Sequence, residues 1–322
     1  MVELSGYVII IGSSNTDFNV YLKRFPKPGE TITGGTFKQF LGGKGANQSV
    51  ASVRSGAKTV FIGKIGEDLF GDQMISRLKS EGINTDHIFK DPQEPSGIAF
   101  ILINERGENM ISVAPGANVK LNSKEIRSKK SLIKNASVVV VQMEIPIDTI
   151  EEIFSIASEG DAIKILNPAP LKKIPLSLIR KIDIIIPNEG ELYQLHSHLG
   201  LKSLENEGKQ KIIQASKEIS DLGINYVITT LGAKGCIIYT KKENKHYEIP
   251  TFKVDAVDTV GAGDCFIGVL AGFLCQGKNI LSAVKYATVA ASIAVTRKGA
   301  QESIPFSNEI ESKFNEEKIR NS

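Results

Sequence analysis

The feature that most limits what this chain can fold into is a repeated alternation of two kinds of segment. Short runs rich in β-branched residues end at glycine, asparagine or proline, and segments with helical periodicity follow them. This alternation is typical of a parallel sheet covered by helices, and the almost continuous apolar character of the runs suits strands that are buried on both faces. The predicted strands are 7–11, 58–62, 137–142, 162–166, 182–186 and 226–229, and the predicted helices include 46–54, 70–80, 149–157, 210–222 and 265–274.

Two segments, 18–40 and 96–113, break this alternation and have the pattern of antiparallel hairpins. In the second segment, 98–103 is expected to pair with 110–113 across the turn Asn-Glu-Arg-Gly at 104–107. A small sheet inserted in an α/β domain is usually a lid or an oligomer contact, because its apolar face must be buried against something. We therefore expect residues 1–322 to form one α/β domain, with 18–40 and 96–113 as a discontinuous lid inserted in it.

Composition and charge exclude several classes of protein. The chain has 39 Lys and Arg against 36 Asp and Glu, a net charge of +3, and shows none of the basic stripes that nucleic-acid binders need. Its apolar-rich stretches, such as 265–277, are shorter than the ~18 residues of a membrane-spanning helix. The N-terminus lacks the basic segment of a signal peptide, so we expect a cytoplasmic protein. Cys236, Cys265 and Cys275 lie in apolar surroundings without zinc-site spacing, and we expect buried free thiols.

The strongest chemical signal is the loop 258–264, which opens an apolar helix. Gly261, Ala262 and Gly263 can present successive backbone N–H groups at the helix N-terminus, which would form a concavity for a phosphoryl group. Asp264 would then be a carboxylate placed to accept a proton from an attacking hydroxyl. The alternative is that Asp264 only caps the helix and complements its dipole. A dinucleotide-binding loop is excluded, because Phe266 stands where that fingerprint needs its third glycine.

A second glycine cluster, at 42–48, opens another helix. It is not a Walker A loop, because Gly45 follows Lys44 where serine or threonine is required. The glycines at 42 and 43 allow close approach by a polyhydroxy ligand, and Lys44 and Asn47 supply donors from the first turn of the helix. A function limited to capping and turning the chain is the alternative.

Three further segments carry polar side chains after predicted strands. Asn15 and Asp17 follow the first strand, at the edge where open α/β sheets bind ligands, and suit the hydroxyls of a sugar, although both residues also favour turns. Asn188 and Glu191 have the spacing to hold waters around Mg²⁺, and the same spacing forms a capping box. The segment 229–235 could admit the phosphates and ribose of a nucleotide, or be a plain turn.

The types, order and spacing of these motifs together resemble the PfkB family of carbohydrate kinases over nearly the whole chain. The matching elements are Gly-Ser-x-Asn-x-Asp at 12–17, Gly-Gly-Lys-Gly-Ala-Asn-Gln at 42–48, Gln-Met-Glu at 142–144, Asn-x-x-Glu at 188–191, Asp-Thr-x-Gly-Ala-Gly-Asp at 258–264 and Ala-Val-Thr-Arg-Lys-Gly-Ala-Gln at 294–301. The resemblance implies a three-layer α/β/α sandwich with a mostly parallel central sheet and a small inserted β-sheet lid. It also implies ATP-dependent phosphorylation of a sugar, D-ribose, at its 5-hydroxyl.

The resemblance assigns a function to each motif. Asp264 would be the catalytic base, and the backbone of Gly261, Ala262 and Gly263 the anion hole. The residues that would hold the sugar are Asn15, Thr16, Asp17, Gly43, Lys44, Gly45, Ala46, Asn47, Glu144 and Asp264. Those that would contact ATP are Asn188, Glu191, Thr230, Leu231, Gly232, Ala233, Lys234, Gly235, Gly263, Asp264 and Thr288, with Asn188 and Glu191 organising Mg²⁺. A monovalent cation, K⁺, would be bound by Asp258, by the backbone carbonyls of Val260, Ala294, Arg297 and Gly299, and by Ser303.

The same resemblance implies that the lid closes over the sugar and pairs between two subunits to form a homodimer. Two alternatives remain open at this point. A related kinase of the family would act on deoxyribose, fructose or a nucleoside, although Asn15, Asp17 and Glu144 favour a small free polyol over a nucleoside. A sugar- or nucleotide-sensing module without catalytic activity would use the same fold, and the intact Asp264 beside Gly-Ala-Gly argues against it.

Overall fold

The largest element of the fold is a mostly parallel sheet, as the sequence predicted. The computed structural model describes residues 6–320, with side chains described up to 316. The strands of this sheet are β1 (Val8–Ile11), β4 (Thr59–Ile62), β9 (Val138–Gln142), β10 (Ile163–Asn167), β11 (Ile184–Ile185), β12 (Tyr226–Thr230), β13 (Cys236–Thr240) and β14 (Lys245–Ile249). Their order is β14-β13-β12-β11-β10-β9-β1-β4. The strands from β12 to β4 are parallel, and β13 and β14 are antiparallel additions at one edge.

Helices cover both faces of the sheet, because each central strand buries side chains on both sides. Along β1, Val8 and Ile10 join one apolar cluster and Ile9 and Ile11 join the other, and all four are fully buried. The first cluster lies under α1 (Lys44–Arg54), α2 (Leu69–Ser80), α9 (Ala262–Cys275), α10 (Ile280–Ala294) and α11 (Ser307–Arg320). The second lies under α3 (Ser123–Arg127), α4 (Lys130–Lys134), α5 (Ile147–Ala157), α6 (Leu176–Ile179), α7 (Glu189–His198) and α8 (Gly208–Asp221). The predicted three-layer α/β/α sandwich is confirmed.

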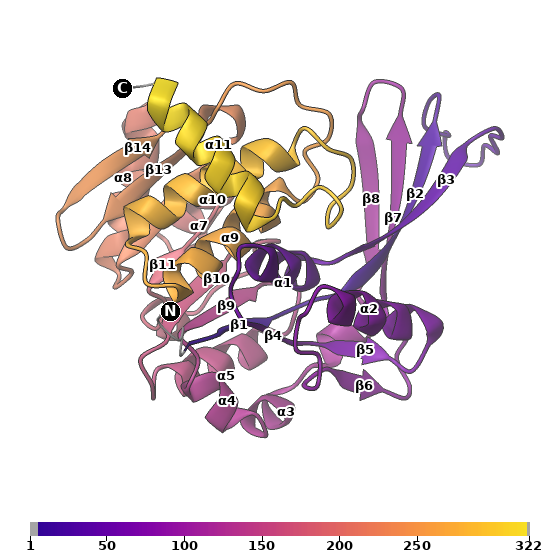
Figure 1. The fold of residues 1–322 in the computed structure, drawn as a ribbon, viewed down its shortest axis with the longest axis horizontal. Coiled ribbons are helices and arrows are strands. Elements are labelled where there is room, and N and C mark those ends of the chain that lie inside the picture. Colours follow the sequence, from indigo (N-terminus) through magenta and orange to yellow (C-terminus); the bar gives the residue numbers. More distant parts are fainter. Residues whose placement is uncertain (1–5, 321–322) are drawn as a thin grey trace.

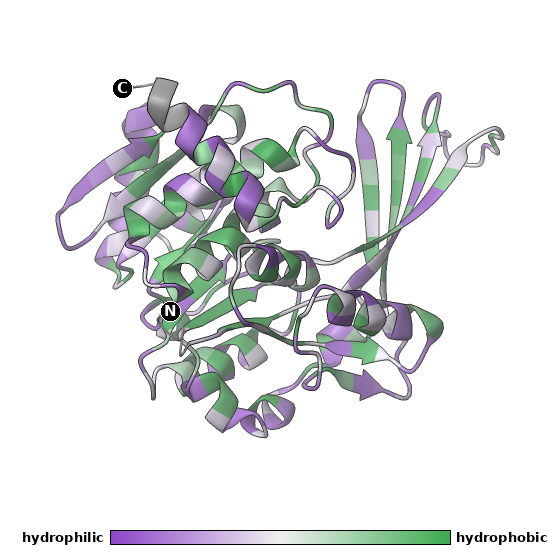
Figure 2. Cartoon of the chain, viewed as in Figure 1, coloured by the Kyte–Doolittle hydropathy of each residue, from purple (hydrophilic) through white to green (hydrophobic). Residues whose placement is uncertain are grey.

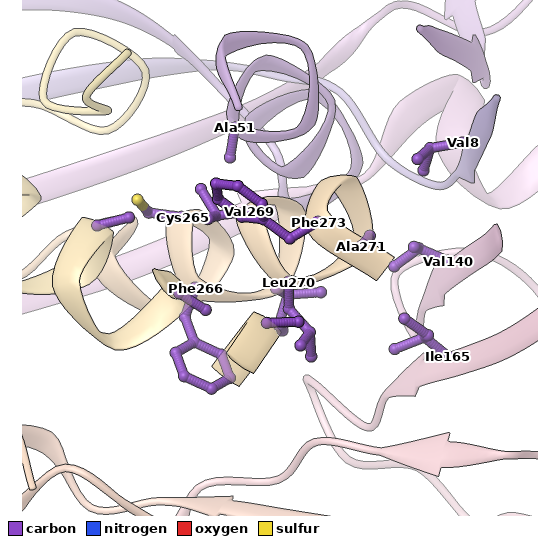
Figure 3. Close-up of a cluster of buried hydrophobic side chains, with 14 of the residues drawn as sticks. Val8, Ala51, Val140, Ile165, Cys265, Phe266, Val269, Leu270, Ala271 and Phe273 are labelled. Atoms are coloured by element: carbon purple, nitrogen blue, oxygen red, sulfur yellow. The ribbon is translucent and has the colours of Figure 1, made fainter. Parts of the chain in front are cut away.

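Helix α9 lies at the centre of the first layer and packs tightly against α1. Figure 3 shows Val269 and Phe273 of α9 near Ala51 of α1, in the same cluster as the strand residues Val8 and Val140. A Cβ atom added at Gly268 would lie 2.2 Å from the carbonyl oxygen of Gln48, so the two helix backbones are nearly in contact. This approach fixes the first turns of α1 and α9 relative to each other.

The two segments predicted as hairpins form one separate sheet. Its strands are β2 (Asn15–Leu22), β3 (Thr36–Gly42), β7 (Gly97–Asn104) and β8 (Asn109–Ala114), in the order β3-β2-β7-β8. The predicted pairing across 104–107 is confirmed, with Leu102 opposite Met110. Strands β2 and β7 are parallel and join the two segments. Figure 1 shows this sheet projecting from the main body beside α1 and α2. We call it the lid sheet.

Several elements differ from the sequence prediction. Strand β2 begins at Asn15, three residues before the predicted hairpin, and β11 is confined to Ile184–Ile185 within the predicted 182–186. The short sheet of β5 (Lys64–Gly66) and β6 (Phe89–Asp91) has no predicted counterpart. The charged segment that begins at 311 belongs to α11 as far as Arg320, and no helix is predicted there. In the described part of the chain, no helix is both long enough and apolar enough to cross a membrane.

Candidate active site

The polar residues selected from the sequence gather at the carboxyl edge of the main sheet. Loops that follow β1, β9, β11 and β12 meet there with the N-termini of α1 and α9. This is the edge at which open α/β sheets bind ligands, because the strand ends and the helix N-termini point their free backbone groups into the same space.

The glycine cluster allows α1 to start directly against the loop that follows β1. Gly43 has φ 87°, a conformation that favours glycine, and a Cβ atom there would lie 2.6 Å from Cα of Ser14. A Cβ atom at Gly45 would lie 2.8 Å from the carbonyl carbon of Gly12. The backbone N–H of Ala46 donates to the carbonyl of Ser13 at 3.0 Å. Bare backbone at these positions therefore brings Lys44 and Asn47 to the polar side chains of β2.

Asp264 lies in the first turn of α9, after Gly261, which has φ 75°. Its two oxygens accept hydrogen bonds from α1: Oδ2 from Nδ2 of Asn47 at 3.0 Å, and Oδ1 from Nε2 of Gln48 at 2.9 Å. Asp264 as a whole is 9 % exposed. Side-chain capping of its own helix, the alternative considered above, is therefore not the arrangement seen. A carboxylate held by two amide donors at the edge of the sheet is placed to accept a proton from a bound hydroxyl.

Charged side chains converge around Asp264. Asp264, followed by Glu144, Glu191 and Asp17, raises the pKa of Lys44 despite the opposing effect of burial. Burial is the main cause that raises the pKa of Asp17 to about 7, and the negative charges of Glu144, Asp264 and Glu302 add to it. Lys44 is thus the cation that offsets several acidic groups in a small volume.

Two of the predicted sugar-binding residues are held by partners that the sequence prediction did not include. Glu144 accepts a hydrogen bond from the hydroxyl of Ser13. Oδ1 of Asn15 accepts from Nδ2 of Asn118 at 2.9 Å, and Asn118 also bonds the backbone N and O of Ser14. Ser13 stood within the 12–17 motif and could have been selected, whereas Asn118 lies in the short 3₁₀ helix η1 (Gly116–Lys120), 103 residues away from Asn15 in the sequence.

The predicted residue Thr16 faces away from Asn15 and Asp17, because successive side chains of a strand point to opposite sides. It is 2 % exposed and lines a narrow space with Phe70 and Met74 of α2. A hollow of about 540 Å³ lies between β3, α2 and Glu302. This hollow lies next to the acidic side chains around Asp264 and is not lined by them. The two are close, because the charge of Glu302 acts on Asp17.

The predicted nucleotide-binding segments lie side by side. Asn188 and Thr230 form a parallel bridge, and the backbone N–H of Thr230 donates to the carbonyl of Pro187 at 3.0 Å. The segment continues through the 3₁₀ turn η2 (Gly232–Lys234) to Gly235, where a Cβ atom would lie 2.0 Å from the carbonyl oxygen of Ile249. Thr288, on α10, is 4 % exposed, and its hydroxyl donates to the carbonyl of Val284 within the helix.

Asn188 and Glu191 form the capping box that was the alternative to a Mg²⁺ site. Oδ1 of Asn188 accepts from the backbone N–H of Glu191, and Oε2 of Glu191 accepts from that of Asn188, both at 2.8 Å. Burial raises the pKa of Glu191, and the charges of Lys44 and Asp264 act on it as well. The capping box and the sugar side of the site are therefore close enough to interact electrostatically.

The two segments predicted to bind a monovalent cation are joined by Asp258. Its Oδ1 accepts from the backbone N–H of Val260 and its Oδ2 from that of Gly299, both at 3.0 Å. A Cβ atom at Gly261 would lie 3.1 Å from Cα of Ala300, so the two segments are in close contact. Among the described residues, no group of three or more His, Cys, Asp or Glu side chains has the arrangement of a metal site. Any cation here would thus depend on backbone carbonyls together with Asp258.

A three-layer α/β/α fold with an acidic residue at a glycine-rich helix N-terminus and a separate lid sheet is the arrangement expected of a small-molecule phosphotransferase. The model of the family described as "pfkB family carbohydrate kinase" matches residues 5–307. The chain belongs to this family and is an ATP-dependent sugar kinase.

The chain is similar to individual ribokinases and deoxyribokinases within this family. The chain is 38% identical to a ribokinase of Staphylococcus aureus over 95% of its own length and 99% of that protein. It is 36% identical to a deoxyribokinase of Salmonella typhimurium, with coverage of 92% and 95%. A structure of Arabidopsis thaliana ribokinase complexed with ribose and ATP matches with a TM-score of 0.87 and 30% identity, with coverage of 96% and 98%. The chain spans 57% of a bifunctional ribokinase/ribose-5-phosphate isomerase A of Fructilactobacillus sanfranciscensis, to which it is 37% identical.

Proposed function

We propose that this chain transfers the γ-phosphoryl group of ATP to the 5-hydroxyl of D-ribose. The observation that carries the proposal is the position of Asp264, held by two amide donors beside Lys44 and the acidic side chains of Asp17 and Glu144. The Staphylococcus aureus ribokinase matches 95% of the chain at 38% identity. The use of ATP as a substrate is consistent with action in the cytoplasm.

In this proposal Asp264 accepts the proton of the 5-hydroxyl as the oxygen attacks the γ-phosphorus in line. The backbone N–H groups of Gly261, Ala262 and Gly263 stabilise the charge that develops on the transferring group, with support from the N-terminus of α9. Lys44 offsets the negative charge that gathers between the acidic residues and the phosphates.

ATP would lie along the paired segments at Asn188 and 230–235. Asn188 and Glu191 offer oxygen ligands of the kind Mg²⁺ prefers, with waters between, although one oxygen of each is used in the capping box. Bound Mg²⁺ would neutralise charge on the phosphates. For K⁺, the donor set of Asp258 and backbone carbonyls near Gly299 fits a hard monovalent cation, and Asp258 already connects the segment that carries Gly261 to the segment that carries Gly299.

The lid sheet would close over the sugar and form the contact of a homodimer. Every residue of β8 is exposed, and Met110 and Ile111 are 54% and 57% exposed. Phe18 stacks on Phe37 and on Phe100, with ring centroids 5.8 and 5.5 Å apart. Figure 2 shows hydrophobic residues along β7 and β8. Phe100 and Met110 lie on one face of the lid sheet and Ile111 on the other, so both faces carry exposed apolar side chains. Apolar lid surface of this kind is buried against something in a stable protein, and a second copy of the lid is complementary to it. Ile111→Glu should convert the dimer to monomer in light scattering.

A second candidate substrate is 2-deoxyribose, because a deoxyribokinase is among the relatives at 36% identity. Ribose is favoured over 2-deoxyribose because the site has several polar side-chain groups that could bond sugar hydroxyls. Asp17 offers a carboxylate, and Oδ1 of Asn47 is a buried acceptor without a partner among the described residues. A site built to bond an extra hydroxyl binds a sugar that lacks it less well, because its own polar groups stay unpaired.

The test is an assay of ADP release over D-ribose, 2-deoxyribose, fructose and a nucleoside, with the product position read by NMR. We expect kcat/KM for ribose to exceed that for 2-deoxyribose by about tenfold or more, and phosphate on the 5-oxygen. Equal or better use of 2-deoxyribose would select the second candidate. Binding of ribose and ATP without any ADP release would favour a sensing module and contradict the proposal.

A further inference from the structure

Beneath Asp264 lies a buried row of three side-chain amides that the proposed reaction does not yet use. Gln48, on α1, and Gln142, at the end of β9, are fully buried, and Asn167, at the end of β10, is 6 % exposed. Nε2 of Gln48 donates to Oδ1 of Asp264 at 2.9 Å and lies 3.3 Å from Oδ1 of Asn167. Nε2 of Gln142 donates to Oε1 of Gln48 at 2.6 Å.

The orientation of these amides follows from one backbone group. Nδ2 of Asn167 bonds the carbonyl oxygen of Ile186 at 3.1 Å, and a carbonyl oxygen can only accept. Asn167 must therefore turn its own oxygen toward Gln48, which must present its amino group to that oxygen. The oxygen of Gln48 then faces Gln142, which donates to it. The direction of every hydrogen bond is thus fixed from Ile186 outward, and the remaining N–H of Gln48 points at Asp264.

The two donors to Asp264 differ in how firmly they are held. Asn47 bonds Oδ2 and stands at the sugar side of the site, where its Oδ1 has no partner among the described residues. Gln48 bonds Oδ1 of Asp264, and it is also held by Asn167, which accepts from its Nε2, and by Gln142, which donates to its Oε1. A bound sugar can therefore take Asn47 away from Oδ2 without disturbing the bond to Oδ1. This arrangement leaves Oδ2 more accessible to a bound hydroxyl than Oδ1.

We propose that Gln48 is a positioning residue for the proposed base: oriented by Asn167 and Gln142, it anchors Oδ1 of Asp264 and leaves Oδ2 free to take the proton of the sugar hydroxyl. The proposal rests on the function proposed above. An N–H donated to a carboxylate favours the ionised form of that carboxylate, so removal of the Gln48 donor should change the pH dependence of the reaction. The other charged groups that face Asp264 are Lys44 on α1, Asp17 on β2 and Glu191 on α7, and all three stay in place in the variants below.

The experiment compares Gln48→Met and Gln142→Met with wild type in ADP-release kinetics from pH 5 to 9. Methionine keeps the length of the side chain and removes the N–H donors. For Gln48→Met we expect kcat to fall about 10- to 100-fold, the worth of a hydrogen bond to a charged group, with KM for sugar and ATP changed less than about threefold. The acid limb of the kcat profile should move to higher pH by about one unit.

Gln142→Met should lower kcat in the same direction but less, because Gln48 remains. The double variant should be no slower than Gln48→Met, since Gln142 acts only through Gln48. The matched control is Gln276→Met. Nε2 of Gln276, at the C-terminal end of α9, donates to the carbonyl of Ser55, at the C-terminal end of α1, at 2.9 Å. The variant therefore also removes a glutamine N–H donor between the two helices, but at the end far from Asp264. The control should retain the pH profile and kcat of wild type.

Three results would overturn the proposal: a wild-type acid limb in Gln48→Met, a rise in KM with unchanged kcat, or effects of Gln48→Met and Gln142→Met that multiply in the double variant. If Gln48→Met does not fold, the acid limb of Gln142→Met alone decides, and a limb that does not move counts against the proposal. Failure of the proposed function can be distinguished from failure of the role of Gln48, because the first would be seen with the wild-type enzyme in the substrate panel. The variants are then measured with the sugar that the panel identifies.

Discussion

Replacing Asp17 with asparagine should stabilise the fold at neutral pH while it weakens sugar binding. Burial and the charges of Glu144, Asp264 and Glu302 raise the pKa of Asp17 to about 7 in the folded chain, from an ordinary value of 3.8. As the pH rises, the unfolded chain therefore loses this proton before the folded chain does. The stability that protonated Asp17 contributes is complete below about pH 4 and is lost as the pH rises through 7.

The magnitude follows from the two pKa values. One pKa unit corresponds to about 1.4 kcal/mol, so a rise from 3.8 to about 7 sets an upper value of about 4 kcal/mol for the cost of ionised Asp17. The carboxylate is partly exposed, and water and Lys44 reduce this cost. We expect Asp17→Asn to raise the free energy of unfolding by about 1 to 3 kcal/mol at pH 8, and by about a third of that at pH 5.

Urea unfolding of both proteins at pH 5 and pH 8 measures this difference. Asp255→Asn, at an exposed aspartate, is the control and should change the free energy of unfolding by less than about 0.5 kcal/mol at either pH. The same Asp17→Asn variant should raise KM for the sugar by about tenfold or more, since an acceptor of two hydroxyl bonds becomes an amide. If Asp17→Asn raises the free energy of unfolding equally at the two pH values, or lowers it at pH 8, the electrostatic reasoning is refuted.

Three other substitutions or conditions test separate parts of the site. Asp264→Asn should lower kcat by about 10² to 10⁴ and leave ATP affinity nearly unchanged in calorimetry; turnover near wild type would remove Asp264 from its proposed role. Gly43→Ala should cost about 2 to 4 kcal/mol in urea unfolding, because the new methyl would meet the backbone of Ser14 at 2.6 Å and the φ of 87° disfavours alanine. Activity should be several-fold higher in K⁺ than in tetramethylammonium, and Asp258→Ala should abolish that difference; equal rates of the wild type in both salts would contradict the cation site.

The main sheet could be predicted because most of its parallel strands are recognisable from their own residues as short apolar runs. A run such as 137–142 is apolar throughout, as a strand buried on both faces requires, and the structure places β9 at Val138–Gln142. Shorter elements lacked such a signal. Strand β11 contributes only Ile184–Ile185, and the pair β5 and β6 has no alternation long enough to distinguish strands from loops. Element boundaries depend on hydrogen bonds to partners that are distant in sequence.

The candidate site was predictable where a residue type and its local backbone point to the same chemistry. The glycines at 43 and 261 have positive φ and lie against neighbouring backbone, so the motifs around them identify the helix N-termini. The partners that fix the acidic side chains were not predictable in this way. Asn118 reaches Asn15 across 103 residues, and nothing in its own neighbourhood distinguishes it from an asparagine in a turn.

The hydrogen bonds of Asp264 illustrate why the sequence left its role open. A carboxylate three residues after the start of a helix is equally consistent with capping and with catalysis, and local sequence cannot separate the two. The structure distinguishes the two roles through α1, whose backbone approaches α9 so closely at Gly268 that no side chain fits between the helices. This contact brings Asn47 and Gln48 within 3.0 and 2.9 Å of the carboxylate, and their amides take the place that the backbone N–H groups of α9 would occupy in a cap. Packing between two helices far apart in sequence thus keeps the carboxylate of Asp264 from capping α9, and the same glycine contact supports both the base and the proposed phosphate site at the N-terminus of α9.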